Sequence, residues 1–426
     1  MNIKISMTDS EILLNELYNG DEKVITCQRN GYKKLSAEFE QKFKTTPSNY
    51  FSSPGRTEIS GNHTDHNHGM VIAASINLDS IAAASVNDSN EVILFSEGYK
   101  EPFKVNLNNL NPVEFEAGTT NALIRGIASR FMEKGFSAGG FNACITSDVI
   151  KGSGLSSSAS IEVLIGTIFN HLYNDGRIPA SEIAKIGLYS ENVFFKKPCG
   201  LMDQMACAVG GIVSIDFNDL ENPVIEKINY EFAQENYSMV IVHTGGSHIS
   251  LTNDYAAIPT EMREVAAAFN KMNCNEISYE EFLSGVKTLR NKVSDRAILR
   301  AYHFYKENER VKKQVTALRS NDFKKFLTLA NESGNSSFKY LQNIYSSNDP
   351  MFQPVSVALA FTEDFINKIG EGACRIHGGG FEGTIQVFLN NKFVNEFINY
   401  ISDISDSFKV LNLNIRKVGT TKVILD

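Results

Sequence analysis

The stretch Lys151-Gly152-Ser153-Gly154-Leu155-Ser156-Ser157-Ser158-Ala159-Ser160 places glycines and serines directly before a helical pattern. In that pattern the apolar residues of 161–172 recur at spacings of three and four, which predicts an amphipathic helix. Glycines let backbone N–H groups approach a ligand closely, and the unpaired amides at a helix start favour an anion. Serine hydroxyls can add ligands for phosphate oxygens or for a magnesium ion. The stretch therefore predicts a phosphate site at the start of a helix.

A plainer interpretation of this stretch is a serine N-cap behind a flexible glycine turn, which is common at helix starts. No lysine follows the glycines, so the loop differs from the GxxxxGK[ST] loop of P-loop enzymes, and it is not a GxGxxG loop. A nucleotide site here would have another design and needs support from elsewhere in the chain.

The composition is that of a soluble globular protein with an acidic excess. The 426 residues are 42% hydrophobic and 21% charged, and their number predicts two domains at ~100 to 200 residues per domain. The formal net charge is −8, so we expect no nucleic-acid partner and no acidic-membrane partner. The six cysteines include no CxxC pair, which favours reduced thiols over disulfides or a zinc ribbon. Without a signal-peptide core or ~18 uninterrupted apolar residues, we expect a cytoplasmic protein.

Helical and strand patterns alternate along the chain. Helices are predicted over 9–18, 35–43, 121–134, 181–195, 355–369 and 392–404, and helical patterns also fill most of 258–341. Strands are predicted over 70–76, 81–86, 91–95, 143–146, 212–217, 238–243, 384–389 and near 422–425. This mixture indicates an α+β or α/β protein with mixed or antiparallel sheets. The polar stretch 218–236 predicts the domain boundary, giving domains 1–225 and 226–426.

A second stretch, Pro54-Gly55-Arg56-Thr57-Glu58-Ile59-Ser60-Gly61-Asn62-His63-Thr64-Asp65-His66-Asn67-His68-Gly69, is dense in polar side chains. Such side chains are costly to bury without partners. One interpretation is a metal site of His63, Asp65, His66 and His68, although the spacing is not that of a helical HExxH pair. A second is a polyol site in which Asp, Asn and His bind hydroxyl groups. A third is a solvated polar turn.

Two further stretches carry candidate groups. Asp203 follows a glycine turn between Met202 and Met205, so it is either a buried structural acceptor or a catalytic carboxylate. Glycines crowd residues 378–383, directly before a strand pattern. That run either lets backbone approach a ligand or another segment closely, or forms only a turn.

In this order the four stretches resemble the GHMP kinase superfamily, and galactokinases within it. Residues 55–69 resemble the galactokinase GEHTDYNxG signature, and residues 152–160 resemble the GLSSSA phosphate loop. Residues 199–204 resemble the CGxMDQ segment, and residues 378–384 the third, glycine-rich motif. The resemblance implies an N-terminal domain like ribosomal protein S5 domain 2 and a ferredoxin-like C-terminal domain, with the active site in the cleft between them. It also implies transfer of a phosphoryl group from ATP to the anomeric hydroxyl of a sugar.

The resemblance also implies roles for individual residues. Asp203 matches the catalytic aspartate and Arg56 the arginine beside it, while Ser158 and Glu191 match the ligands of a magnesium ion. The positions that match sugar ligands are Asn62, His63, Asp65, Gly200 and Tyr255. The positions that match the ATP phosphate loop are Gly152, Ser153, Gly154, Leu155, Ser156, Ser157 and Ser158.

The departures from the family pattern concern the sugar. Asn62 replaces the signature glutamate, His66 replaces a tyrosine, and Glu382 and Thr384 replace a glycine and a cysteine. We expect galactose and ATP as substrates and a monomeric enzyme. The alternatives are a kinase for another galactose-like sugar such as galacturonate, which a glutamate would repel, and a catalytically silent sensor of sugar and ATP.

Overall fold

The structure is a computed structural model that describes residues 8–150, 152, 154–197, 199–245, 251–381 and 383–425. Within these residues the chain forms an eight-stranded and a four-stranded sheet. The larger sheet runs β12-β1-β2-β5-β3-β4, with β6 and β7 continuing from β2. Its strands are β1 (Asn49–Ser60), β2 (Met70–Val86), β3 (Glu91–Ser96), β4 (Phe103–Asn106), β5 (Phe141–Ser147), β6 (Ile212–Asp216), β7 (Val224–Ile228) and β12 (Thr421–Val423).

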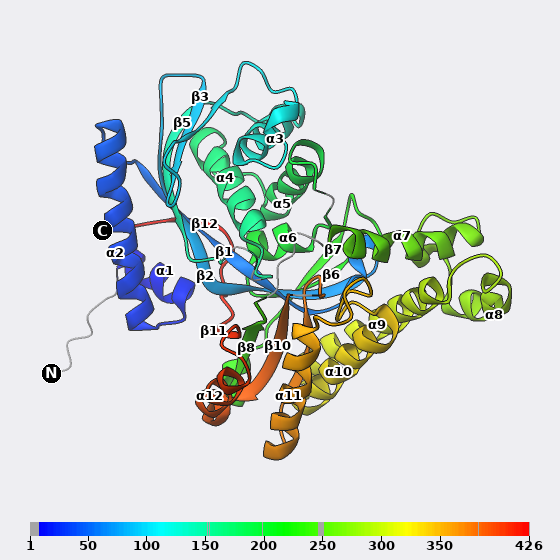
Figure 1. The fold of residues 1–426 in the computed structure, drawn as a ribbon. Coiled ribbons are helices and arrows are strands. Elements are labelled where there is room, and N and C mark those ends of the chain that lie inside the picture. Colours follow the sequence, from blue (N-terminus) through cyan, green and yellow to red (C-terminus); the bar gives the residue numbers. More distant parts are fainter. Residues whose placement is uncertain are drawn as a thin grey trace.

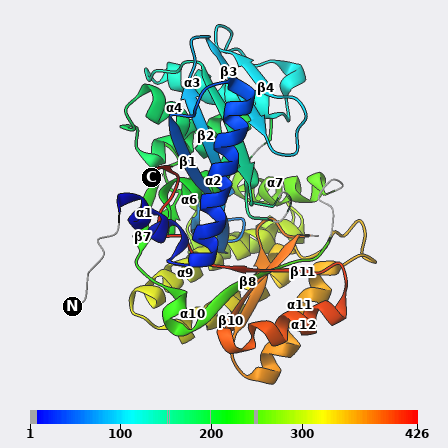
Figure 2. The same ribbon diagram turned by 90° about the vertical axis from the view of Figure 1, so that its left-hand side faces the viewer.

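Helices cover both faces of the larger sheet (Figures 1 and 2). On one face lie α1 (Asp9–Tyr18) and α2 (Glu22–Phe43), and on the other lie α3 (Thr120–Glu133), α4 (Ser157–Tyr173), α5 (Ala180–Tyr189) and α6 (Met202–Val209). Successive residues of β2 serve opposite faces: Ala82 and Ala84 pack toward α3–α6, and Ile81 and Ala83 toward α1 and α2. This explains why β2 is apolar on both sides.

The smaller sheet has the order β11-β8-β10-β9, and all its neighbours are antiparallel. Its strands are β8 (Tyr237–His243), β9 (Ala373–His377), β10 (Thr384–Asn390) and β11 (Lys409–Leu413). Helical segments connect β8 to β9 and β10 to β11, which is the βαββαβ arrangement of a ferredoxin-like unit. The helices of this half are α7 (Thr252–Ala268), α8 (Tyr279–Leu289), α9 (Asp295–Arg319), α10 (Phe323–Ser336), α11 (Pro354–Ile369) and α12 (Val394–Ile404).

One continuous apolar core joins the two sheets. Ile59 and Ile72 of the larger sheet pack in the same cluster as Ile241 and Phe388 of the smaller sheet. The two halves of the fold therefore share buried surface at the ends of β1 and β2, where the polar stretch 54–69 lies.

The expected boundary between residues 225 and 226 falls inside β7, which pairs with β6 in the larger sheet. The chain also returns to that sheet at its end, because β12 pairs with β1. The polar stretch 218–236 contains β7, whose side chains are mostly exposed or half-buried, so its composition did not indicate a strand. A division into two domains stays a prediction, and the strand pairing adds 226–228 and 421–423 to the first of them. Among the described residues, no helix combines the length and apolar character that a membrane span requires.

Candidate active site

Arg56 and Asp203 form the centre of the candidate site. Arg56 lies on β1, and Asp203 is the second residue of α6. The guanidinium donates two hydrogen bonds to the carboxylate, Nε to Oδ1 and Nη2 to Oδ2, each at 2.6 Å. Its third edge, Nη1, donates to the carbonyl oxygen of Gly154. One arginine therefore ties the carboxylate to the glycine-serine loop.

The surroundings of Asp203 keep it ionised. Burial raises the pKa of its carboxyl, but the Arg56 guanidinium and a hydrogen bond from the Ser156 hydroxyl outweigh burial and hold that pKa below 3.8. The Asp203 side chain is 27% exposed, so a substrate hydroxyl can still reach it. The position at a helix start also favours a negative charge.

The glycine-serine loop has the geometry expected of an anion site. Gly152 and Gly154 have φ of 75° and 73°, and Ser156, the N-cap of α4, has φ of 57°. Ser157 and Ser158 are the first helical residues, so backbone amides there have no partner within the helix. Leu155 contributes only backbone, because its side chain is fully buried in the core that joins the sheets.

Ser153, also expected to bind ATP, lies outside the described residues, as do Lys151 and Glu382.

Glu191 lies in a π-helical turn, Ser190–Phe194, that continues α5. Its Oε1 accepts from the Ser158 hydroxyl at 3.3 Å and from Lys197 Nζ at 2.9 Å. Its Oε2 accepts from Gln204 Nε2 and from the Cys199 thiol, both at 2.8 Å. The two residues expected to bind magnesium are therefore within one hydrogen bond of each other.

A second carboxylate, Glu162, lies beside this pair. Gln204 Nε2 donates to Glu162 Oε2 at 2.9 Å as well as to Glu191, and Glu162 Oε1 is buried without a hydrogen-bond partner in the described part of the chain. Burial, followed by the charge of Glu191, raises the pKa of Glu162 well above 4.5. Hydroxyl and carboxylate oxygens are donors that suit magnesium, so the residues present fit that ion.

The side chain of Asn62 faces away from solvent and is 0% exposed. Its amide nitrogen donates to Gly378 O at 2.7 Å and to Glu58 Oε1 at 3.1 Å. Its amide oxygen accepts from Asn343 Nδ2 at 2.8 Å and from Ser337 Oγ at 3.2 Å. The carboxylate missing at position 62 is therefore present one hydrogen bond away, on Glu58.

His63 presents an unused acceptor. Burial, followed by the neighbouring His66, lowers its pKa to about 3, so the ring is neutral. Its Nε2 lies 3.0 Å from Gly379 O and must carry the proton, because a carbonyl only accepts. Nδ1 is then an acceptor, and it is buried without a partner among the described residues.

The other expected sugar ligands lie around the same loop. A Cβ on Gly200 would come within 2.0 Å of Asp65 Oδ2, so the Asp65 carboxylate rests directly on the Gly200 backbone. Tyr255 of α7 donates to Gly380 O at 3.0 Å, in the glycine turn that also accepts from His63. The structure brings His63 and Tyr255 together at this turn, and it places Asp65 against Gly200, three residues before Asp203.

Metal binding by His63, Asp65, His66 and His68 receives no support. No group of three or more His, Cys, Asp or Glu side chains in the described parts of the chain could hold a metal ion. The stretch is also not a solvated turn, since residues 54–62 are buried and residues 63–69 are buried or half-buried.

His377 connects the smaller sheet to the strand that carries Arg56. The Glu58 N–H donates to His377 Nε2 at 3.2 Å, so Nε2 is an acceptor and Nδ1 donates to Thr384 Oγ1 at 2.9 Å. Burial lowers the pKa of His377 well below 6.5, and the Arg56 and Arg375 charges lower it further. A buried ion pair at 2.8 Å between Arg375 and Glu58 joins the same two strands.

Comparison with known proteins identifies the family. Two family models match the chain: the GHMP kinases N terminal domain at residues 122–211 and the galactokinase galactose-binding signature at residues 37–86. A galactokinase of Clostridium tetani is 30% identical over 383 residues, which are 87% of this chain and 91% of that protein. The chain belongs to the galactokinase family. A galactokinase of Clostridium beijerinckii is 29% identical and covers 90% of this chain and 98% of that protein.

Solved structures confirm the fold of this galactokinase family member. The Lactococcus lactis galactokinase complexed with galactose covers 92% of this chain and 99% of its own, with a TM-score of 0.80 and 24% identity. A mevalonate kinase matches with a TM-score of 0.60 and 18% identity. The mixed α/β fold of GHMP kinases expected from the sequence is therefore confirmed.

Sequence reasoning missed Glu162, Lys197 and His377. Glu162 could have been found, because a carboxylate four residues after Ser158 lies on the same helix face as that serine. Lys197 lies six residues after Glu191, a spacing that the three-and-four pattern of a helix face does not pair. His377 gave no comparable signal, since its partners Thr57 and Glu58 are about 320 residues away in the chain.

Proposed function

We propose that this galactokinase family member transfers the γ-phosphoryl group of ATP to the anomeric hydroxyl of galactose. The observation that carries the proposal is the two-point pair of Arg56 and Asp203, bonded by Ser156 and Gly154 to the start of α4. It places an ionised, reachable carboxylate beside unpaired backbone amides that favour phosphate.

In this proposal Asp203 first orients the sugar hydroxyl by accepting its hydrogen bond. A carboxylate whose pKa is lowered is a weak base, so it receives the proton only as the new O–P bond forms and the hydroxyl becomes acidic. Arg56 holds the carboxylate in place and stabilises negative charge on the transferring group. General-base assistance of this kind contributes about 10² to 10⁴ in rate.

The phosphates of ATP are placed at the α4 N-terminus, where Ser157 and Ser158 supply backbone amides and hydroxyls. Ser158 and Glu191 would hold a magnesium ion, which neutralises charge on phosphate oxygens when bound. Lys197, paired with Glu191 at 2.9 Å, adds a positive charge on the same side.

Galactose is the proposed sugar because His63 and Asp65, in the loop 62–65, offer acceptors for sugar hydroxyl groups. His63 Nδ1 is an unpaired acceptor, and Asp65 lies against Gly200 three residues before the catalytic carboxylate. The Asn62 side chain is occupied by Glu58, so its neutrality does not leave the region without a carboxylate. Glu58 is itself buried and paired with Arg375, so position 62 does not decide between galactose and galacturonate.

The test is ADP release from ATP and magnesium with galactose, galacturonate, N-acetylgalactosamine and arabinose, for wild type and Asp203→Ala. We expect galactose to give the highest kcat/KM and the variant to lose the sugar-dependent signal. Activity restricted to another sugar would overturn the substrate. Sugar-independent or absent ADP release would overturn the kinase and favour a silent sensor.

A further inference from the structure

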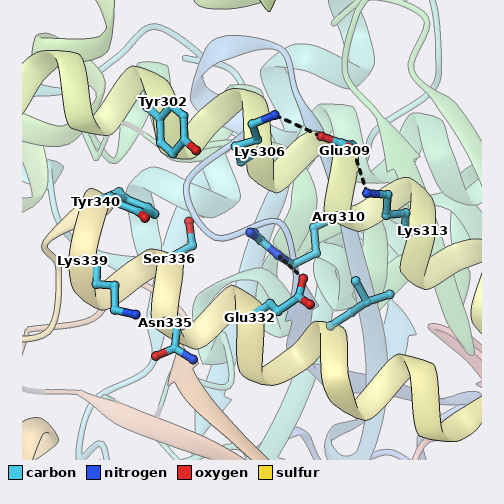
Figure 3. Close-up of a pocket in the computed structure, with 11 residues that line it drawn as sticks. Tyr302, Lys306, Glu309, Arg310, Lys313, Glu332, Asn335, Ser336, Lys339 and Tyr340 are labelled. Atoms are coloured by element: carbon cyan, nitrogen blue, oxygen red, sulfur yellow. Dashed lines mark hydrogen bonds and ion pairs between the residues drawn. The ribbon is translucent and has the colours of Figure 1, made fainter.

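A separate cavity of about 530 Å³ lies between α9 and the segment formed by α10 and the π-helical turn Ser337–Leu341 (Figure 3). This is the size of small-ligand sites, which span about 300–1,000 Å³. None of its lining residues belongs to the candidate active site. The lining includes Tyr302, Lys306, Arg310 and Lys313 from α9 and Lys339 and Tyr340 from the facing turn.

The charges of the lining favour an anion. Lys306, Arg310, Lys313 and Lys339 outnumber the two carboxylates, Glu309 and Glu332, on a chain whose formal net charge is −8. Lys306 and Lys313 share the single carboxylate of Glu309, at 3.4 and 2.7 Å. Lys339 makes no salt bridge with any described residue. Arg310 pairs with Glu307, so Lys339 is the one cation of this lining without a salt bridge to a described residue. A cation left in this way favours a phosphate or carboxylate oxygen.

Unused hydrogen-bonding groups add to the charge. Arg310 pairs with Glu307 through Nη1, but its Nε is buried without a hydrogen-bond partner in the described chain and lies 3.8 Å from Glu332. At the other end, the rings of Tyr302 and Tyr340 meet edge to face with centroids 5.0 Å apart. Neither tyrosine hydroxyl has a partner among the described residues.

We propose that this cavity binds a small phosphorylated sugar. Lys306, Arg310 and Lys339 would bind the phosphate, and Tyr302 and Tyr340 would contact the sugar ring and its hydroxyls. Charge-assisted hydrogen bonds to phosphate provide most of the affinity, and the tyrosines favour a hydroxylated body over phosphate alone.

The floor of the cavity is hydrogen-bonded to the sugar loop of the active site. Ser336 Oγ, in the lining, donates to His303 Nδ1 at 2.9 Å, and His303 Nε2 donates to Asn62 O at 2.9 Å. Glu307, the partner of Arg310, accepts from Gly61 N at 3.2 Å. A ligand that moves Arg310 or Ser336 therefore changes the position of residues 61–62. This coupling rests on the proposed function, whereas binding in the cavity does not.

The experiment is calorimetric titration of the full chain, without galactose or ATP, with glucose 6-phosphate, inorganic phosphate and glucose. We expect glucose 6-phosphate to bind with a dissociation constant of about 0.1–1 mM, tighter than phosphate, and glucose not to bind. The variant Lys306→Gln/Lys339→Gln should weaken binding at least about tenfold. The matched control is Lys312→Gln/Lys325→Gln, exposed lysines of α9 and α10 outside the lining.

Absence of binding to wild type, or equal binding by the Lys306→Gln/Lys339→Gln variant, overturns the site. The second result would mean that the phosphate ester occupies the active site instead. Coupling is measured as a change in the KM for galactose when glucose 6-phosphate is added to wild type. An unchanged KM, or the same change in the Lys306→Gln/Lys339→Gln variant, overturns the coupling. Failure of the proposed function is distinguished because it abolishes ADP release without affecting the calorimetric result.

Discussion

Arg56 and Asp203 lie 147 positions apart in the sequence, yet the Arg56 guanidinium donates hydrogen bonds of 2.6 Å to both oxygens of the Asp203 carboxylate. The same guanidinium donates to Gly154 O, and the Arg56 N–H donates to Leu155 O at 3.0 Å. The position of the Asp203 carboxylate, the proposed base, and the shape of the glycine-serine loop are therefore both held by one residue of β1. A change at Arg56 should affect protonation and phosphate placement together.

The first prediction concerns Arg56→Gln, which keeps a hydrogen-bond donor but removes the charge. Without that charge, burial raises the pKa of Asp203, so the carboxylate is protonated at a higher pH than in wild type. We expect kcat to fall about 10²- to 10³-fold and the acid limb of its pH profile to move upward. Measuring kcat over about pH 5 to 9 tests this. An equal loss at every pH would show that the guanidinium does not control the protonation of Asp203.

The second prediction concerns Gly200→Ala. The added Cβ would stand 2.0 Å from Asp65 Oδ2, so the Asp65 carboxylate must move away from the position at which it is proposed to bind the sugar. A lost charge-assisted hydrogen bond costs about 1.5–3 kcal/mol, so the KM for galactose should rise about 10- to 100-fold with a smaller change in kcat. Asp65→Ala should have a similar effect alone and add little to Gly200→Ala, since both remove one contact. Fully additive effects would contradict this.

The third prediction concerns stability at Glu162. The raised pKa means that the folded protein holds this carboxyl protonated where the unfolded chain ionises it, so stability is lost as pH rises above the usual glutamate range. Glu162→Gln resembles the protonated acid and should remove this loss. Glu162→Ala removes one of the two acceptors of Gln204 Nε2 and leaves a cavity, so it should cost about 1–3 kcal/mol at every pH. Urea unfolding at about pH 5 and 8 measures both. If Gln destabilises as much as Ala, Glu162 is ionised in the fold.

Local signals in the sequence were enough to predict the glycine-serine turn before α4 and many of the helices. The first helix was predicted at its observed bounds, Asp9–Tyr18, and α4 begins at Ser157, four residues before its apolar stripe. Glycine turns, helix caps and apolar spacing depend on near neighbours, so one sequence records them. The four motifs then identified the family that the comparisons confirm.

Elements that depend on distant partners could not be predicted in this way. The stretch 54–60 has the polar composition of a loop, but it is a buried strand because Arg375 and His377 satisfy its polar groups. The buried position of Asn62 likewise depends on Ser337 and Asn343, which are about 280 residues away in the chain. The spacing of residues within a motif does not reveal which distant residues will become their partners.

The last prediction concerns His377, which is neutral because burial and two arginines oppose its protonation. The unfolded chain takes up a proton at this residue below about pH 6.5, whereas the folded protein does not, so His377 makes wild type less stable as pH falls. Relative to His377→Gln, wild type should lose about 1.4 kcal/mol of unfolding free energy between about pH 7.5 and 5.5. Comparing variants separates this effect from buried carboxyls such as Glu58, which titrate in the opposite direction.

Thr384→Val is the matched control for this prediction, because it removes the partner of His377 Nδ1 and leaves the histidine in place. It should lower stability by a constant amount across the range, about 1 kcal/mol for one hydrogen bond. Urea unfolding of the three proteins at each pH gives the differences. A difference in unfolding free energy between wild type and His377→Gln that does not change with pH would contradict the prediction. It would mean that the His377 ring is protonated in the folded protein, so its Nε2 could not accept from the Glu58 N–H.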